Sequence, residues 1–267
     1  MDTTFTPADV AAFEHATWSR SAPGYEEGFA VLTREAVGPL LSAARVQSGT
    51  RLLDVGTGSG VVAAIAREMG ADVVGIDFSE AMLVEARRLV PEVVFRTAAA
   101  DSLPFDDTSF NAVVANGVLH HLGEPQRALE EAHRVLTDGG RIACTVWAAP
   151  ETLEAFGLFF AAVEEYAGSA ELPHGPLFGV TDYETLSSLF IAAGFSDVEV
   201  STIETTWKLP TIDPLLRAFG TWAQLDSFPA NTRGAIEASV RSAAKAYETE
   251  AGLSIPNPML LIAAAKQ

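Results

Sequence analysis

The chain has little cysteine, few basic residues and no long apolar run. Cys144 is the single cysteine in 267 residues, which excludes a disulfide framework or a thiolate metal cluster within one chain. There are 17 Lys and Arg residues against 35 Asp and Glu, and a net charge of −18 argues against coating nucleic acid or anionic lipid. No stretch approaches the roughly 18 apolar residues of a membrane span, and no signal-peptide pattern opens the chain. We therefore expect a cytoplasmic protein without a nucleic-acid or membrane partner, and the sequence leaves its oligomeric state open.

The apolar residues that are present follow the order of an α/β protein. With 48% hydrophobic and 19% charged residues, the chain can bury a sizeable core. Its first half alternates short apolar runs with helical patterns, which is typical of a parallel sheet flanked by helices. The expected strands are 51–55, 72–77, 93–96, 110–116, 141–147, 198–207 and 258–265. The expected helices are 60–69, 79–89, 124–136 and 181–194, with Ser79 as an N-cap and a capping box of Thr181 and Glu184.

Two stretches, 149–180 and 209–255, interrupt this alternation. Both are expected to leave the sheet at the carboxyl end of a strand, where ligands bind in such folds. Their large apolar side chains are Phe156, Phe159, Phe160, Tyr166, Phe178, Phe219, Trp222 and Phe228. We interpret the two stretches as helical caps over a ligand site. The alternative, favoured for any one of these aromatic residues, is that it fills the core of the cap.

A glycine-rich turn follows the first expected strand, in the sequence Leu52-Leu53-Asp54-Val55-Gly56-Thr57-Gly58-Ser59-Gly60. Glycines at this place let the backbone turn tightly and approach a ligand at the start of the next helix. The spacing is G-x-G-x-G, whereas dinucleotide-binding proteins use G-x-G-x-x-G. Asp54 precedes the first glycine by two residues, and its carboxylate would repel a pyrophosphate but suits an ammonium group. The turn therefore favours a ligand that carries positive charge.

Two further acidic residues follow the second and third expected strands. Asp77 ends the second strand, where a carboxylate can bind both hydroxyls of a ribose. Asp101 follows the third strand and can accept a hydrogen bond from an exocyclic amine, while Phe78 and Met82 offer apolar surface to a flat base. Each of these carboxylates alone could merely cap a helix or a turn. With Asp54, they form a series at three successive strand ends, which favours a ligand site.

These motifs resemble those of the class I, Rossmann-like S-adenosylmethionine-dependent methyltransferases, in particular the quinone-biosynthesis and natural-product group. The resemblance covers about residues 52–147 and rests on LLDVGTGSG, VVGIDFSEAML, AADSLPFDDTSFNAVVANGVLHHL and VLTDGGRIACTVW. It implies a seven-stranded, mostly parallel sheet with a final antiparallel strand. It also implies a helical lid over 1–48, a cofactor-binding core of 49–148, 181–208 and 256–267, and cap insertions that form the substrate pocket.

The resemblance implies a role for individual residues, with S-adenosylmethionine as cofactor. The methionine moiety would lie near Asp54 and the turn residues Gly56, Thr57 and Gly58, and the ribose on Asp77. The adenine would contact Phe78, Met82, Asp101 and Ser102, and Asn116 would lie on the sulfonium side. The stretch from Trp18 to Tyr25 resembles the lid segment, with Tyr25 as the expected contact.

Methyl transfer from a sulfonium is a single displacement that depends mostly on alignment and on exclusion of water. A base is needed only where the acceptor must lose a proton. His120 and His121, just after the fourth strand, are the candidate catalytic residues, and the alternative is that they only pack locally. His174 is a more distant candidate, and we expect His15 and His133 to be structural and distant from the strand ends. Cys144 is expected in the core, and the spacing of His and Cys does not indicate a metal site.

The expected reaction is methyl transfer to a small, largely apolar or aromatic acceptor, with O-methylation slightly favoured. Residues 116–119 lack the Asn/Asp-Pro-Pro-aromatic motif of methyltransferases that act on nucleobase amines. The alternative is a protein of the same fold that binds the cofactor but catalyses a cyclisation or pericyclic step. A binding module without activity is disfavoured, because the whole cofactor motif is intact.

Overall fold

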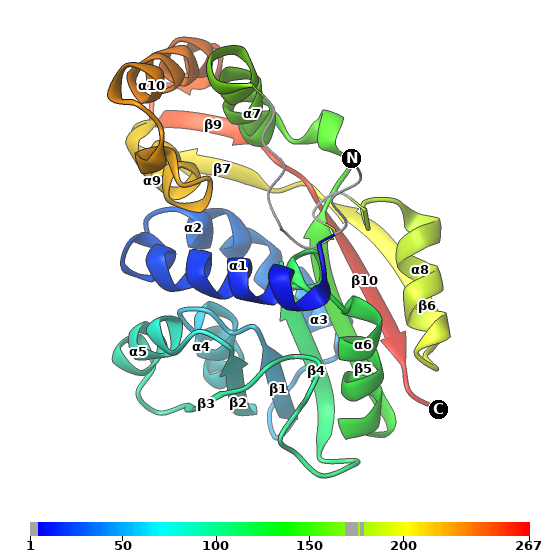
Figure 1. Ribbon diagram of the computed structural model, residues 1–267. Helices are drawn as coiled ribbons and strands as arrows, with labels where there is room; N and C mark the ends of the chain where they lie inside the picture. The colour runs from blue at the N-terminus through cyan, green and yellow to red at the C-terminus, as the bar shows by residue number, and fades with distance from the viewer. Residues whose placement is uncertain (1–4, 169–175, 177–178) are drawn as a thin grey trace.

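The computed structural model describes residues 5–168, 176 and 179–267 (Figure 1). Its main sheet has seven strands in the order β3-β2-β1-β4-β5-β10-β6. Their bounds are β1 Arg51–Val55, β2 Asp72–Asp77, β3 Val94–Thr97, β4 Phe110–Asn116, β5 Leu136–Trp147, β6 Ser196–Ile203 and β10 Met259–Ala265. β10 is antiparallel to both of its neighbours, β5 and β6, whereas the β1–β2, β1–β4, β2–β3 and β4–β5 pairs are parallel. The expected sheet, including its final antiparallel strand, is therefore confirmed.

Helices cover both faces of this sheet, because successive apolar side chains of a strand point to opposite faces and both faces must be buried. Leu52 of β1 belongs to a buried cluster with Leu40, Ala66 and Leu83 of three helices on one face. Leu53 belongs to the cluster on the other face, with helices α6 and α8. The helices are α3 Val37–Ala43, α4 Val61–Glu68, α5 Glu80–Leu89, α6 Pro125–Val135 and α8 Tyr183–Ala192. Ser79 caps α5 as predicted, but the side chain that caps α8 is Asp182, not Thr181.

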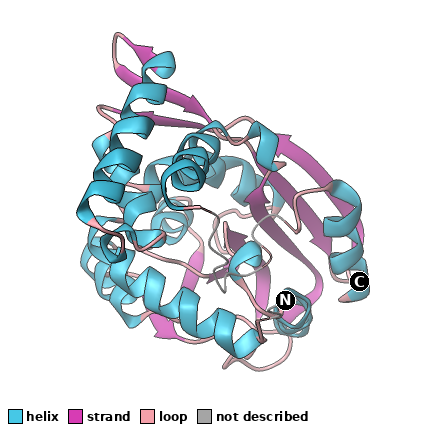
Figure 2. Ribbon diagram, turned by 45° about the horizontal axis from the view of Figure 1, so that its top comes forward, coloured by secondary structure: helices cyan, strands magenta, loops and turns pink. Residues whose placement is uncertain are grey.

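A second, three-stranded sheet lies apart from the main one, in the order β7-β9-β8 (Figure 2). Its strands are β7 Thr206–Leu209, β8 Glu248–Thr249 and β9 Gly252–Pro256, and the helices around it are α7 Glu154–Ala167, α9 Asp213–Trp222 and α10 Ala230–Ala244. The single strand expected over 198–207 is therefore wrong, since it divides into β6 and β7. The segment 209–255 contains strands as well as the expected helices.

The division has a local cause at Thr205 and Asn257. The backbone N–H of Asn257 donates to the Thr205 carbonyl at 2.9 Å, and the Thr205 hydroxyl donates to the Asn257 carbonyl at 2.5 Å. Both residues are buried, and each lies where its chain passes between the two sheets. These bonds satisfy buried polar groups that would otherwise lose their partners at the corner.

The N-terminal helices complete the molecule. Helix α1 (Pro7–Ser21) begins at a capping box of Thr6 and Asp9 and lies between the main sheet and the upper layer of α9 and β7 in Figure 1. α2 (Phe29–Thr33) follows and packs on β7. None of the described helices has the length and apolar character needed to cross a membrane.

Candidate functional site

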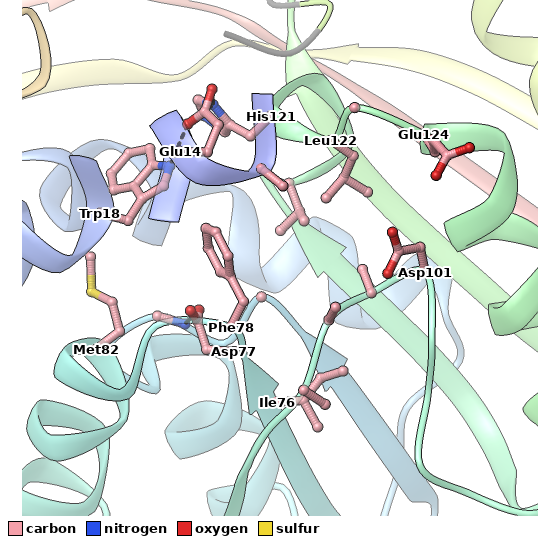
Figure 3. Close-up of a pocket in the computed structure, with 18 of the residues that line it drawn as sticks. Glu14, Trp18, Ile76, Asp77, Phe78, Met82, Asp101, His121, Leu122 and Glu124 are labelled. Atoms are coloured by element: carbon pink, nitrogen blue, oxygen red, sulfur yellow. Dashed lines mark hydrogen bonds and ion pairs between the residues drawn. The ribbon is translucent and has the colours of Figure 1, made fainter. Parts of the chain in front are cut away.

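A cavity of about 520 Å³ lies at the carboxyl ends of β1, β2 and β4, with α1 along one side (Figure 3). That volume is in the usual range for a small-molecule site. Of the predicted site residues, those that line it are Tyr25, Gly56, Gly58, Asp77, Phe78, Met82, Asp101, Asn116 and His121. Asp54, Thr57, Ser102 and His120 are not in the lining. The cavity thus brings together most of the predicted site residues, from loops far apart in sequence.

The glycine-rich turn borders the cavity through Gly56 and Gly58, which have no side chains. Gly56 has a φ of 65°, and a Cβ at this residue would lie 2.5 Å from Cγ2 of Val118. Gly58 has a φ of 56°, and a Cβ there would contact the ring of Tyr25 at 3.5 Å. Both positions therefore require glycine, one for space and both for the left-handed backbone.

Asp77 is held rigidly at the end of β2. Its Oδ2 accepts a hydrogen bond from the Gly58 N–H at 3.0 Å, and its Oδ1 accepts from the Ser79 N–H at 2.9 Å. Desolvation raises the pKa of Asp77 to about 6, although these hydrogen bonds favour the charged form. The carboxylate joins the glycine-rich turn to the second strand and still lines the cavity.

Asp54 lies beneath the turn, 1% exposed. The Thr57 hydroxyl donates to its Oδ2 at 2.6 Å, and Oδ1 has no hydrogen-bond partner in the described part of the chain. Burial, and then the charge of Asp77, raise the pKa of Asp54 to about 7. Asp77 lines the cavity and Asp54 lies behind it, close enough for their charges to interact. Both carboxylates are costly to ionise, and a cationic ligand would stabilise both charged forms.

Apolar residues and the loop after β3 form the next part of the wall. Phe78 and Met82 line the cavity together with the residues from Ala98 to Asp101. Arg134 fastens this loop by donating to the Leu103 carbonyl at 3.0 Å and to the Phe105 carbonyl at 2.8 Å. Ser102 is exposed beside the lining.

His15 and His133 differ in their distance from the site. The His15 ring centroid lies 5.5 Å from that of Phe78, since α1 crosses the strand ends. Placing His15 far from those ends was therefore wrong. His133 packs instead on Phe195, with ring centroids 5.0 Å apart. Two predicted residues, His174 and Phe178, lie outside the described residues.

Asn116 is fixed at the end of β4 by two hydrogen bonds. Its Nδ2 donates to the Thr33 carbonyl at 3.0 Å, and its Oδ1 accepts from the Thr145 hydroxyl at 2.6 Å. Both partners come from neighbouring elements, so the side chain has a single orientation toward the cavity wall.

The two adjacent histidines occupy different environments. His120 is fully buried on the 3₁₀ turn Leu119–His121, neither of its ring nitrogens has a partner in the described chain, and its ring lies 5.4 Å from that of Trp147. Burial keeps the pKa of His120 well below that of an exposed histidine. His121 lines the cavity, and its Nδ1 lies 3.2 Å from the Glu14 carboxylate. Of the two, only His121 can meet a ligand in this cavity.

Sequence reasoning missed Glu14. This residue of α1 is buried, lines the cavity and accepts a hydrogen bond from the Trp18 indole N–H at 2.9 Å. Its only sequence signal is an acidic side chain on a helix whose neighbouring positions are mixed in polarity. A contact with His121, 107 residues away, is not visible in a local pattern.

The aromatic residues of the two cap segments pack chiefly on one another. Phe219 stacks on Phe159 with ring centroids 4.8 Å apart, and Phe156 meets Phe219 edge-on at 4.9 Å. No described residue of 149–180 or 209–255 lines the cavity of Figure 3. Cys144 is buried in β5, and no group of three His, Cys, Asp or Glu residues in the described ranges could hold a metal ion.

The geometry fits a ligand such as S-adenosylmethionine. The cavity offers the buried carboxylate of Asp77 to a ligand, a glycine backbone to a close approach, and Phe78 and Met82 to a flat base. An unpartnered oxygen of Asp54 lies directly below the turn, within the described part of the chain. The residues that form the cavity and those directly behind it therefore agree with the ligand that the sequence motifs imply.

Comparison with known proteins agrees with this fit. Residues 53–144 match the family model "Methyltransferase domain". The demethylmenaquinone methyltransferase of Clavibacter sepedonicus is 37% identical over 190 residues, covering 66% of this chain and 75% of that relative. The enzyme of the same name from Thermus thermophilus is 36% identical over 167 residues, covering 55% of this chain and 74% of the relative.

Solved structures share the fold. A Bacillus halodurans structure titled a putative methyltransferase has a TM-score of 0.58 at 22% identity, covering 86% of this chain and 98% of that one. The [4+2]-cyclase SpnF has a TM-score of 0.54 at 23% identity, covering 87% and 81%. The chain therefore belongs to the class I, Rossmann-like S-adenosylmethionine-dependent methyltransferases, and S-adenosylmethionine is its cofactor.

Proposed function

We propose that this methyltransferase acts on a small aromatic acceptor of the quinol type, at a hydroxyl group in preference to nitrogen or carbon. The relatives from Clavibacter sepedonicus and Thermus thermophilus carry the name demethylmenaquinone methyltransferase, and about three-quarters of each is covered. A reduced quinone carries phenolic hydroxyls, and these must lose a proton before they become good nucleophiles. An acceptor of this class therefore needs a group in the cavity that can take up its hydroxyl proton.

For the cofactor, the proposed contacts follow the walls of the cavity. Asp77 binds the ribose, and Phe78 and Met82 hold the adenine. Asp101, with Ser102 beside it, accepts from the exocyclic amine. The methionine moiety lies along Gly56, Thr57 and Gly58 with Asp54 below, Asn116 is on the sulfonium side, and Tyr25 covers the turn. What supports this assignment is that eight of these eleven residues line one cavity.

The observation that carries the proposed reaction is the position of His121. It lines the same cavity as Asp77, and in Figure 3 it lies with Glu14 across the cavity from Asp77 and Phe78. S-adenosylmethionine supplies an electrophilic methyl group and leaves as a neutral thioether. The chain's own part is then to align the acceptor, exclude water and take up the hydroxyl proton at His121. His120 is not assigned this role, since it does not reach the cavity.

Methyl transfer can be tested directly with a panel of acceptors. The protein is incubated with S-adenosylmethionine labelled in its methyl group and with reduced naphthoquinones, simple naphthols and aromatic amines. The proposal predicts that the label forms a methyl ether on a quinol or naphthol oxygen, with one S-adenosylhomocysteine per product. Label on a ring carbon would contradict the preference for a hydroxyl. Transfer to amines alone would contradict the acceptor class.

The same assay decides the alternative of a cyclisation or pericyclic step. The likeness to the [4+2]-cyclase SpnF is one of fold, so it does not bear on the chemistry of the cavity. A product with the same mass as its precursor, formed without S-adenosylhomocysteine, would favour that alternative.

A further inference from the structure

A carboxylate of the N-terminal helix reaches the histidine at the end of β4. Glu14 of α1 is 1% exposed, and its carboxylate lies 3.2 Å from Nδ1 of His121, whose side chain is 12% exposed. The two residues are 107 positions apart in sequence. Helix α1 therefore adds a buried acidic group to a histidine that faces the cavity.

Which atom donates in this contact depends on the tautomer of His121. The Trp18 indole N–H can only donate, and it donates to Glu14 at 2.9 Å, so that the carboxylate acts as the acceptor. An ionised carboxylate beside Nδ1 favours the tautomer with the hydrogen on Nδ1. Nε2 then carries the free lone pair, and in the described chain it makes no hydrogen bond.

Aromatic neighbours restrict the orientation of the ring. The Trp18 ring meets that of His121 edge-on with centroids 5.0 Å apart, and the centroid of the His120 ring lies 4.3 Å from that of His121. A ring held by these contacts and by one hydrogen bond has little freedom to turn Nδ1 toward the cavity.

We propose that Glu14 is a positioning residue that holds His121 with a bare Nε2 toward the acceptor. This inference rests on the proposed function, in which the acceptor is a hydroxyl compound. The O–H bond of the acceptor breaks, the proton moves to Nε2, and the electron pair stays on the acceptor oxygen, which becomes the nucleophile. The resulting imidazolium is stabilised by the Glu14 carboxylate.

The charges around the ring are consistent with this role. Glu14 faces His121 from α1, and the neutral His120 is adjacent on the same turn. Asp77, Asp101 and Glu124 line the same cavity from β2, from the loop after β3 and from the start of α6. Together they give the cavity an acidic lining, which is consistent with uptake of the acceptor's proton at this ring.

The test compares Glu14→Gln with Glu27→Gln. Glu27 lies in the same N-terminal segment, is exposed and pairs with Arg217 at 2.9 Å, outside the cavity. For Glu14→Gln we expect kcat to fall about 100-fold, with the acceptor KM and the cofactor Kd within threefold of wild type. Glu27→Gln should match the wild type in all three quantities.

A second readout does not depend on turnover. In the wild-type protein, ¹⁵N-detected histidine NMR should find the neutral His121 ring with its hydrogen on Nδ1, and in Glu14→Gln a larger share should carry it on Nε2. A wild-type ring with its hydrogen on Nε2, or an unchanged kcat in Glu14→Gln, would overturn the proposal. If no acceptor is methylated while the tautomer is as expected, the proposed function fails and the contact between the two residues stands.

Discussion

Asp54→Asn tests the electrostatic strain at the cofactor end of the cavity. In the folded protein the pKa of Asp54 is raised from 3.8 to about 7, because the side chain is buried without a cation. One pKa unit corresponds to about 1.4 kcal/mol, so ionising Asp54 costs the cofactor-free fold about 4 kcal/mol relative to the unfolded chain. The raised pKa means that the folded state holds this proton more tightly. The proton on Asp54 therefore stabilises the folded state fully below pH 4, and this stabilisation is lost as the pH rises through 7.

The amide introduced by Asp54→Asn does not ionise, so the variant avoids this loss. The amide oxygen can still accept the hydrogen bond that the Thr57 hydroxyl donates to the carboxylate at 2.6 Å in the wild type. We expect the stability advantage of Asp54→Asn, without cofactor, to grow by about 3 kcal/mol between pH 5 and pH 8. Urea unfolding at several pH values measures it.

A matched control is Asp72→Asn, which alters an exposed carboxyl at the opposite end of β2. Because this side chain is exposed, the difference in stability from wild type should change much less between pH 5 and pH 8 than it does for Asp54→Asn. If the difference between Asp54→Asn and wild type is equally flat, the buried carboxyl is not the source of strain and the argument for a cationic ligand loses its basis.

Three further predictions concern the cavity and the core. Binding of S-adenosylmethionine should release protons at pH 6, because the pKa values of Asp54 and Asp77 are raised to about 7 and 6 and a cation favours the ionised carboxylates. Calorimetry in two buffers of different ionisation enthalpy counts the released protons, and no release would contradict the assignment. Gly56 has a φ of 65°, and Gly56→Ala places a Cβ 2.5 Å from a methyl group of Val118, so the variant should bind the cofactor at least tenfold more weakly. Gly157 of α7 has open space around it, so Gly157→Ala should bind the cofactor with wild-type affinity. Phe219→Ala should lower the free energy of unfolding by about 3–5 kcal/mol, because this ring is fully buried. The cofactor Kd should stay within a few-fold of wild type, because the ring does not line the cavity, and a large loss of affinity would show that the cap controls the cofactor site.

The sequence predicted those parts of the fold that depend on local patterns. The strand at 51–55, the N-cap at Ser79 and the antiparallel last strand all follow from short-range chemistry or from the family motif. The same motifs named nine residues that line one cavity, because the carboxyl ends of neighbouring parallel strands meet at one edge of the sheet.

The remaining features depend on contacts between distant segments. The passage from β6 to β7 requires Thr205 to bond Asn257, 52 positions away, and neither residue carries a local signal for it. The partnership of Glu14 and His121 likewise appears only once α1 lies across the strand ends. Sequence patterns also did not separate His120 from its neighbour, since which of the two faces a cavity depends on the turn that they share.

The central claim is that this cavity is the cofactor site, and calorimetric titration of S-adenosylmethionine into the wild type and Asp77→Ala tests it most directly. The account predicts one site per chain in the wild type. In Asp77→Ala it predicts affinity about 10- to 100-fold weaker, because hydrogen bonds to a charged group contribute about 1.5–3 kcal/mol. Equal affinity in a folded Asp77→Ala variant would contradict the claim, since the carboxylate at the end of β2 would then not contact the ligand.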